Sequence, residues 1–171
     1  MTKIDGPRLA PKSGKADALV VFLHGYGADG RDLIDLGQQW QNFLPHAAFV
    51  SPHAPEPCGM SPMGRQWFPL TMRDPSERWR GVVGARPSLD AFLDEELAKH
   101  HLAPDRLALV GFSQGTMMAL HVGLRRKIPP AGIIGFSGYL AGADHLDDAT
   151  GKPPILLVHG DQDQVLPLDS L

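Results

Sequence analysis

Ser113 is the residue of this sequence best placed for chemistry, because it stands at the centre of a glycine-rich turn. The segment Gly111-Phe112-Ser113-Gln114-Gly115 has the pattern G-x-S-x-G, between a strand-like apolar run at 106–110 and a helix-like stretch at 116–121. In this setting the pattern indicates a nucleophile elbow, in which a strained turn holds the serine hydroxyl above a sheet. We therefore predict that Ser113 is a nucleophile. The alternative is a glycine-rich turn that contains a serine by chance.

Two other expected strands also end in turns that carry polar residues. His24-Gly25-Tyr26-Gly27 follows the apolar run 18–23, and His159-Gly160-Asp161-Gln162-Asp163 follows the run 155–158. In open α/β sheets, catalytic groups gather at the carboxyl ends of the strands. We therefore expect both turns to lie at the same edge of a sheet as Ser113.

The elements that must position these turns alternate along the chain. Apolar, β-rich runs predict strands at 18–23, 47–50, 106–110, 133–136 and 155–158. Apolar residues recur at helical spacing from Leu33 to Leu44, before Pro45, and again from Leu89 to Leu97; a third helix is expected after the elbow. This alternation predicts an α/β fold in one domain, 1–171, with a mostly parallel central sheet flanked by helices.

Residues 52–80 differ in character from the rest of the chain. Six prolines are expected to prevent regular structure there, while methionines and aromatic residues supply large apolar side chains. A long, irregular and apolar loop is more often functional than disordered. We predict a substrate-side loop in which Met63, Trp67 and Phe68 line an acyl pocket. The alternative is that these side chains only pack the loop onto the sheet.

Composition excludes several classes of function. The chain has 171 residues, 43% of them hydrophobic, and a net charge of −3, which is ordinary for a globular protein and unlike a basic nucleic-acid-binding domain. Its apolar runs have the length of strands, so no membrane span, signal peptide or anchor is expected. A lone cysteine, Cys58, excludes an intramolecular disulfide and favours the cytoplasm. No residues have metal-ligand spacing, no G-x-G-x-x-G loop is present, and nothing predicts an oligomeric state.

Taken together, five segments give the sequence a family resemblance. It resembles the serine esterases of the α/β-hydrolase fold, in the carboxylesterase/phospholipase group that includes the acyl-protein thioesterases. The segments occur in the family's order and span almost the whole chain: Leu23-His24-Gly25-Tyr26-Gly27-Ala28-Asp29-Gly30, Gln66-Trp67-Phe68, Gly111-Phe112-Ser113-Gln114-Gly115, Phe136-Ser137-Gly138 and His159-Gly160-Asp161-Gln162-Asp163.

The resemblance implies hydrolysis of a carboxylic ester or thioester through an acyl-enzyme on Ser113, without a cofactor. It assigns the oxyanion hole to the backbone N–H groups of Tyr26 and Gln114. It makes Asp163 the acid that orients a catalytic histidine, whereas Asp161 is expected to close its turn by local hydrogen bonds. The substrate is expected to be a small-molecule or acyl-chain ester; a small ester, a lysophospholipid and an acylated protein all remain open.

The catalytic histidine is missing from its expected place. The fold orders its triad as serine, acid, histidine, but the eight residues 164–171 that follow Asp163 contain no histidine. We expect a C-terminally incomplete chain that lacks the last strand and helix, has little activity and leaves a sheet edge uncovered. Two alternatives stay open: a base borrowed from His46, His53 or His145, and a non-catalytic acyl-binding relative.

Overall fold

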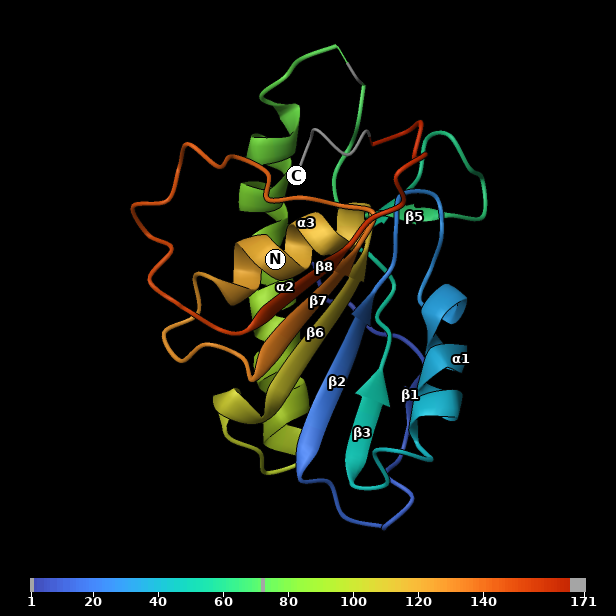
Figure 1. Cartoon of the computed structure of the whole chain (residues 1–171). Helices are drawn as coiled ribbons and strands as arrows, with labels where there is room; N and C mark the ends of the chain where they lie inside the picture. Colours follow the sequence, from blue (N-terminus) through green and yellow to red (C-terminus); the bar gives the residue numbers. More distant parts are fainter. Residues whose placement is uncertain (1, 72, 167–171) are drawn as a thin grey trace.

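A six-stranded, mostly parallel sheet forms the centre of the molecule, as predicted. The structure is a computed structural model that describes residues 2–71 and 73–166. The strand order is β1-β3-β2-β6-β7-β8, and only β1 runs antiparallel to its neighbour (Figure 1). The strands are β1 (Arg8–Leu9), β2 (Ala18–Leu23), β3 (Ala47–Val50), β6 (Leu107–Phe112), β7 (Gly132–Phe136) and β8 (Ile155–Val158).

Helices cover both faces of this sheet. Figure 1 shows α2 (Glu77–Lys99) and α3 (Gln114–Gly123) against one face and α1 (Arg31–Trp40) against the other. A short 3-10 helix, η1 (Pro104–Arg106), leads into β6. The α/β architecture predicted from the alternation of strand and helix patterns is confirmed.

The continuous apolar sequence of β2 explains why it lies in the middle of the sheet. Leu19, Val21 and Leu23 enter the core shared with α2 and α3, while Val20 and Phe22 enter the core shared with α1. All five side chains are buried, because successive residues of a strand point to opposite faces and both faces are covered. Burying each such side chain contributes about 1.5–3 kcal/mol.

The predicted irregular loop 52–80 is shorter and more ordered than expected. It contains a two-stranded hairpin, β4 (Glu56–Pro57) and β5 (Arg65–Gln66), and it ends where α2 begins at Glu77. The helix therefore starts well before the predicted stretch at 89–97 and continues through Pro87. The helical spacing of apolar residues is weak in this first half, and a proline such as Pro87 normally predicts a helix boundary. Tertiary packing of Val82, which is fully buried, overrides both signals.

Two smaller features also differ from the predictions. The N-terminal segment contributes β1, which pairs with β3 through Arg8 and Val50, whereas the first strand predicted from the sequence is 18–23. Helix α1 ends at Trp40, before the predicted end at Leu44. Both differences concern the ends of elements, where local sequence signals are weakest.

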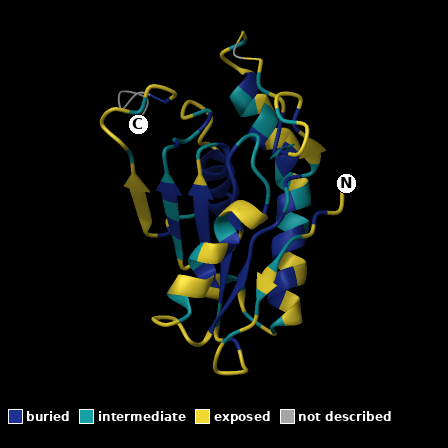
Figure 2. Ribbon diagram, turned by 90° about the vertical axis from the view of Figure 1, so that its right-hand side faces the viewer, coloured by how far each residue is buried: buried dark blue, intermediate teal, exposed yellow. Residues whose placement is uncertain are grey.

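Strand β8 forms an open edge of the described sheet. Its four residues are 38–56% exposed, and Figure 2 shows the strand as exposed along its length. Among the described residues β8 pairs only with β7, so the predicted uncovered edge is confirmed for this part of the chain. None of the helices in residues 2–71 and 73–166 has the length and apolar character needed to cross a membrane.

Candidate active site

The backbone at Ser113 has the strain expected of a nucleophile elbow. Its φ of 53° and ψ of −114° lie in a region that non-glycine residues rarely adopt. A Cβ atom at Gly111 would lie 2.5 Å from both the carbonyl oxygen of Gly115 and the amide nitrogen of Thr116. The turn can therefore close this tightly only with glycine at that position.

Helix α3 begins directly after Ser113. The Ser113 carbonyl accepts hydrogen bonds from the N–H groups of Thr116, at 2.9 Å, and Met117, at 3.3 Å, and the Ser113 N–H donates to the Phe136 carbonyl at 2.8 Å. These bonds fix the serine between β7 and the first turn of α3. The N-terminus of a helix favours negative charge, so developing charge near Ser113 is stabilised.

A cavity of about 400 Å³ opens beside Ser113. Its walls include Tyr26 and Gln114, the two residues predicted to supply the oxyanion hole. Much of the remaining lining is apolar and comes from the loop before α2, from α3 and from the turn after β8: Met60, Leu70, Met117, Val165 and Leu166. Arg78 contributes the one charged side chain among the described lining residues.

The strand register brings the two predicted oxyanion donors together. Leu23 of β2 is paired with Gly111 of β6, and Tyr26 and Gln114 each follow three residues later at the same sheet edge. A hydrogen bond with the Cys58 thiol raises the pKa of the Tyr26 phenol. Because the side chain of Tyr26 is engaged with Cys58, its predicted role stays with its backbone N–H.

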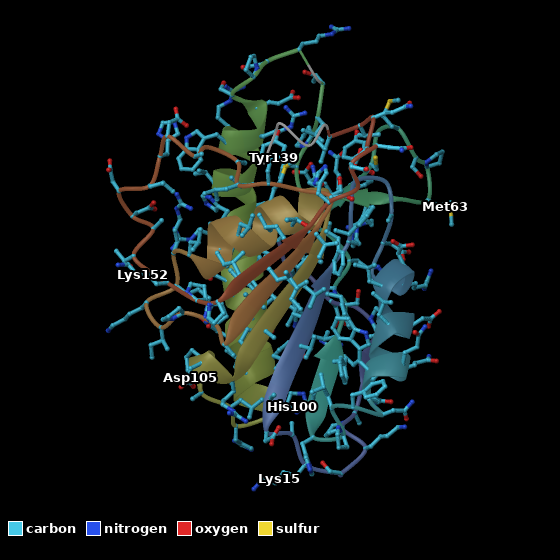
Figure 3. The ribbon with its side chains drawn as sticks, viewed as in Figure 1. Lys15, Met63, His100, Asp105, Tyr139 and Lys152 are labelled. Atoms are coloured by element: carbon cyan, nitrogen blue, oxygen red, sulfur yellow. The ribbon has the colours of Figure 1, made fainter. Side chains whose placement is uncertain are left out.

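The predicted substrate residues Trp67, Phe68 and Met63 do not line this cavity. Trp67 and Phe68 are only 1% and 2% exposed, and they pack the loop against the body of the protein, which was the alternative reading of the sequence. Met63 is 87% exposed, and its side chain points outward from its loop (Figure 3). The geometry therefore does not favour contact between these three residues and a substrate.

Asp163 is held in the turn that follows β8. Its Oδ1 atom accepts hydrogen bonds from the backbone N–H groups of Leu166 and Val165, both at 2.9 Å. These two bonds hold the pKa of the Asp163 carboxyl below its ordinary value, and nearby His159 and Ser137 lower it further. Asp163 is therefore a carboxylate at neutral pH, as a triad acid must be, while Asp161 is exposed.

The two histidines of the sequence motifs, His24 and His159, hold loops by hydrogen bonding. The fully buried His24 accepts a hydrogen bond at Nε2 from the N–H of Ala54, at 2.9 Å, and its Nδ1 pairs with the carbonyl of Gly25, at 2.8 Å. Burial lowers the pKa of His24, so the ring is neutral. The Nε2 atom of His159 pairs with the carbonyl of Leu166 at 2.5 Å and lies 3.6 Å from Oδ2 of Asp163.

No histidine within residues 2–71 and 73–166 shares a hydrogen bond with the hydroxyl of Ser113. His46 lies at the amino ends of the strands, because its neighbour Ala47 is paired with Ala18 at the start of β2. His53 accepts a hydrogen bond from the N–H of Gly30 at 3.1 Å, and the ring of His145 stacks on Trp79 at 4.3 Å. None of the three histidines left open by the sequence is thus placed as the base.

Several residues that line the cavity were not predicted from the sequence, including Val165 and Leu166 in the turn after β8. Met117 lies one helical turn after Ser113, so the spacing of four residues could have indicated it. Met60, Leu70 and Arg78 come from the loop and the start of α2, where no periodic pattern predicts which side chains face the serine. Within the described part of the chain, no group of three or more histidine, cysteine or acidic residues could hold a metal ion.

Comparisons with known proteins identify relatives of this chain. Residues 5–170 match the sequence profile described as phospholipase/carboxylesterase. The chain is 31% identical to acyl-protein thioesterase 1 of Neurospora crassa, over 94% of this chain and 72% of that protein. It is 32% identical to acyl-protein thioesterase 1 of Schizosaccharomyces pombe, over 88% of this chain and 70% of that protein.

A solved structure extends the agreement to the fold. The crystal structure of esterase PE8 matches with a TM-score of 0.95 and 48% identity, over 98% of this chain and 80% of that chain. The predicted α/β-hydrolase fold is confirmed. By its sequence profile and its relatives, the chain belongs to the phospholipase/carboxylesterase family.

Proposed function

We propose that this protein is a serine hydrolase that cleaves carboxylic esters or thioesters through an acyl-enzyme on Ser113. One observation carries the proposal above the others. Ser113 has a strained elbow backbone, with φ of 53°, and it lines a largely apolar cavity together with Tyr26 and Gln114. A nucleophile and two backbone donors around one cavity are two of the parts that acyl transfer requires, and the third is a base.

In the proposed reaction, the Ser113 hydroxyl loses its proton to a histidine and its oxygen attacks the acyl carbonyl. The resulting oxyanion accepts hydrogen bonds from the N–H groups of Tyr26 and Gln114, and loss of one such donor costs about 10²–10³ in rate. The leaving alcohol or thiol takes the proton, and water then hydrolyses the acyl-enzyme. Asp163 stabilises the charged histidine.

The histidine of this mechanism is not among residues 164–171 that follow Asp163. A polypeptide of residues 1–171 alone is therefore expected to turn over slowly, because loss of a triad member costs about 10⁴–10⁶ in kcat. Deacylation needs the same base as acylation. Any acyl group that reaches Ser113 in this polypeptide is thus expected to remain there.

The cavity supports an apolar acyl group as the recognised part of the substrate. Met60, Leu70 and Met117 supply apolar surface of a size that fits a short to medium acyl chain. The relatives are named as thioesterases and an esterase, which supports both leaving groups. We retain a small carboxylic ester as the proposed substrate class, with a cytoplasmic location and no nucleic-acid partner as further predictions.

A non-catalytic acyl-binding protein is the second candidate. It is favoured by the lack of a hydrogen bond between Ser113 and a histidine among the described residues. Such a protein would keep the apolar cavity and bind an acyl chain without covalent chemistry. Covalent labelling of Ser113 therefore separates the two candidates.

The test uses p-nitrophenyl acetate, butyrate and octanoate, with release of p-nitrophenol and mass spectrometry of the protein as readouts. We expect an acyl group on Ser113, and its loss in Ser113→Ala. Ser88→Ala, which removes a serine from α2, is the matched control and is expected to label normally. Labelling or turnover that survives in Ser113→Ala contradicts the proposed nucleophile. Binding of octanoate without any labelling supports the acyl-binding alternative.

A further inference from the structure

A short segment, Arg65–Phe68, connects the two parts of the predicted oxyanion hole; we call it the strap. It contacts the Tyr26 turn through three hydrogen bonds. The Gly27 N–H donates to the Arg65 carbonyl at 2.9 Å, and the Arg65 N–H donates to the Ala28 carbonyl at 2.7 Å. The indole Nε1–H of Trp67 donates to the carbonyl of His24 at 2.9 Å.

The other end of the strap is held by the side chain of Gln114. Its Oε1 atom accepts from the backbone N–H of Trp67, and its Nε2 atom donates to the carbonyl of Phe68, both at 2.8 Å. The amide thus pairs with two successive residues of the strap, as a neighbouring strand would. Gln114 is 1% exposed, so water does not replace these bonds if they break.

The strap has little freedom to move between these two attachments. Trp67 is 1% exposed and its ring lies 5.7 Å from the ring of His24, which is itself fully buried. Phe68 packs so closely on α2 that a Cβ atom at Gly81 would lie 2.3 Å from its ring. A close-packed segment of this kind transmits a displacement at one end to the other.

We infer that the side chain of Gln114 is a positioning group. Through the strap, it sets the distance between the backbone N–H of Tyr26 and the backbone N–H of Gln114. The inference rests on the proposed function. Oxyanion donors must lie about 2.7–3.1 Å from the developing charge, so a small change of spacing weakens one of the two bonds. Gln114 thereby acts twice, with its backbone at the oxyanion and with its amide on the strap.

The experiment breaks each end of the strap separately. Gln114→Met keeps the length of the side chain and removes both of its hydrogen bonds. Trp67→Phe removes only the bond to the His24 carbonyl and leaves Gln114 intact. Gln41→Met is the matched control, because Gln41 donates a 2.7 Å bond to the carbonyl of Ala10, on the far edge of the sheet.

Two kinetic readouts on the protein as its gene encodes it distinguish positioning from general stability. In Gln114→Met, kcat for a p-nitrophenyl ester is expected to fall about 10–100-fold with little change in KM. The ratio of kcat/KM for an ester to that for the matching thiono ester is also expected to fall. A loosened hole loses its preference for oxygen over the larger, weakly accepting sulfur. A variant that is only less stable keeps the same kcat and the same ester to thiono-ester ratio, when both are calculated for the folded molecules.

A third readout needs no activity. The backbone amide resonance of Tyr26 is expected to shift in Gln114→Met and in Trp67→Phe, and to stay in place in Gln41→Met. The double variant is expected to lose no more than the stronger single variant, since both act through one strap. An unshifted Tyr26 resonance, or additive losses, overturns the inference. If Gln114→Met fails to fold, Trp67→Phe tests the inference by the same criteria. A wild-type protein that shows no Ser113-dependent hydrolysis contradicts the proposed function and leaves the test of the strap by the Tyr26 resonance in place.

Discussion

A Cβ atom at Gly115 would lie 1.8 Å from the carbonyl oxygen of Leu23. The first turn of α3 therefore rests directly on the carboxyl end of β2, with no side chain between them. This contact brings the segment that carries Gln114 next to the turn that carries Tyr26. The second glycine of the G-x-S-x-G pattern is thus required by a neighbouring strand as well as by the turn itself.

Gly115→Ala is expected to destabilise the fold by on the order of 3 kcal/mol, because backbone atoms must separate to admit the methyl group. Gly84→Ala in α2 is the matched control: nothing lies within 4 Å of its Cβ position. That variant is expected to stabilise the protein by about 0.5–1 kcal/mol, since alanine favours a helix interior. Urea unfolding measures both, and a neutral Gly115→Ala would contradict the contact.

Arg8→Met is expected to cost about 2 kcal/mol of stability, because it leaves a buried carboxylate without its main partner. Glu96 is fully buried and accepts hydrogen bonds from Nε and Nη2 of Arg8 at 2.9 and 2.7 Å, with Lys99 as a second partner. The exposed pair of Arg106 and Asp17 provides the control, and Arg106→Met is expected to cost less than about 0.5 kcal/mol. Equal losses in the two variants would contradict this assignment.

His121 is expected to make the protein less stable as the pH falls. Burial, with Arg125 and Arg86 nearby, lowers its pKa from 6.5 to about 4, against the weaker opposing effect of Asp148. Between about pH 4 and pH 6.5, the unfolded chain therefore binds a proton at His121 that the folded chain does not bind. The stability contributed by neutral His121 is complete above pH 6.5 and is lost as the pH falls towards 4.

Between pH 7.5 and pH 5 this loss amounts to about 2 kcal/mol. His121→Phe keeps a ring against Trp79, which lies 5.4 Å from the His121 ring, and removes the titrating group. Urea unfolding at the two pH values is expected to show a smaller difference in the variant. A variant with the same pH dependence as the wild type would refute the role of His121.

Two methionines of the same loop distinguish the cavity wall from the loop surface. Met60 and Met63 are 82% and 87% exposed, but only Met60 lines the cavity beside Ser113. Met60→Ala is expected to alter the acyl-chain preference for p-nitrophenyl esters, and Met63→Ala to leave it unchanged. Leu70→Trp, which narrows the cavity, is expected to lower the preference for octanoate over butyrate about 10-fold. A changed profile in Met63→Ala alone would restore the prediction made from the sequence.

In a polypeptide of residues 1–171, the exposed edge strand β8 is expected to promote self-association. Leu156 in its middle is 56% exposed, and an open apolar edge can pair with another chain. Leu156→Lys is expected to reduce light scattering at high protein concentration without changing the fold. Leu146→Lys replaces a leucine that is 47% exposed in a loop and belongs to no strand, and it serves as the control. Equal effects of the two lysines would indicate general solubility rather than edge pairing.

The sequence by itself determined the features that depend on neighbours along the chain. Continuous apolar runs predicted β2, β3, β6, β7 and β8, because such runs are typical of strands in a parallel sheet. They did not distinguish the central strands, which are buried, from β8, which is exposed along the edge of the described sheet. The G-x-S-x-G pattern predicted the elbow at Ser113, because the glycines on either side are dictated by the turn. The polar residues after β2 and β8 marked Tyr26 and Asp163 for the same sheet edge, where parallel strands end together.

Only the tertiary structure determined the roles that depend on contacts between residues far apart in the sequence. Gln114 and Trp67 are 47 residues apart, and no local pattern indicates that the amide of one holds the backbone of the other. The same holds for Trp67 and Phe68, whose size suggested a pocket wall but whose burial makes them packing residues, and for the long first half of α2. Such roles follow from which surfaces meet in three dimensions, and a periodic sequence pattern reports only on one element at a time.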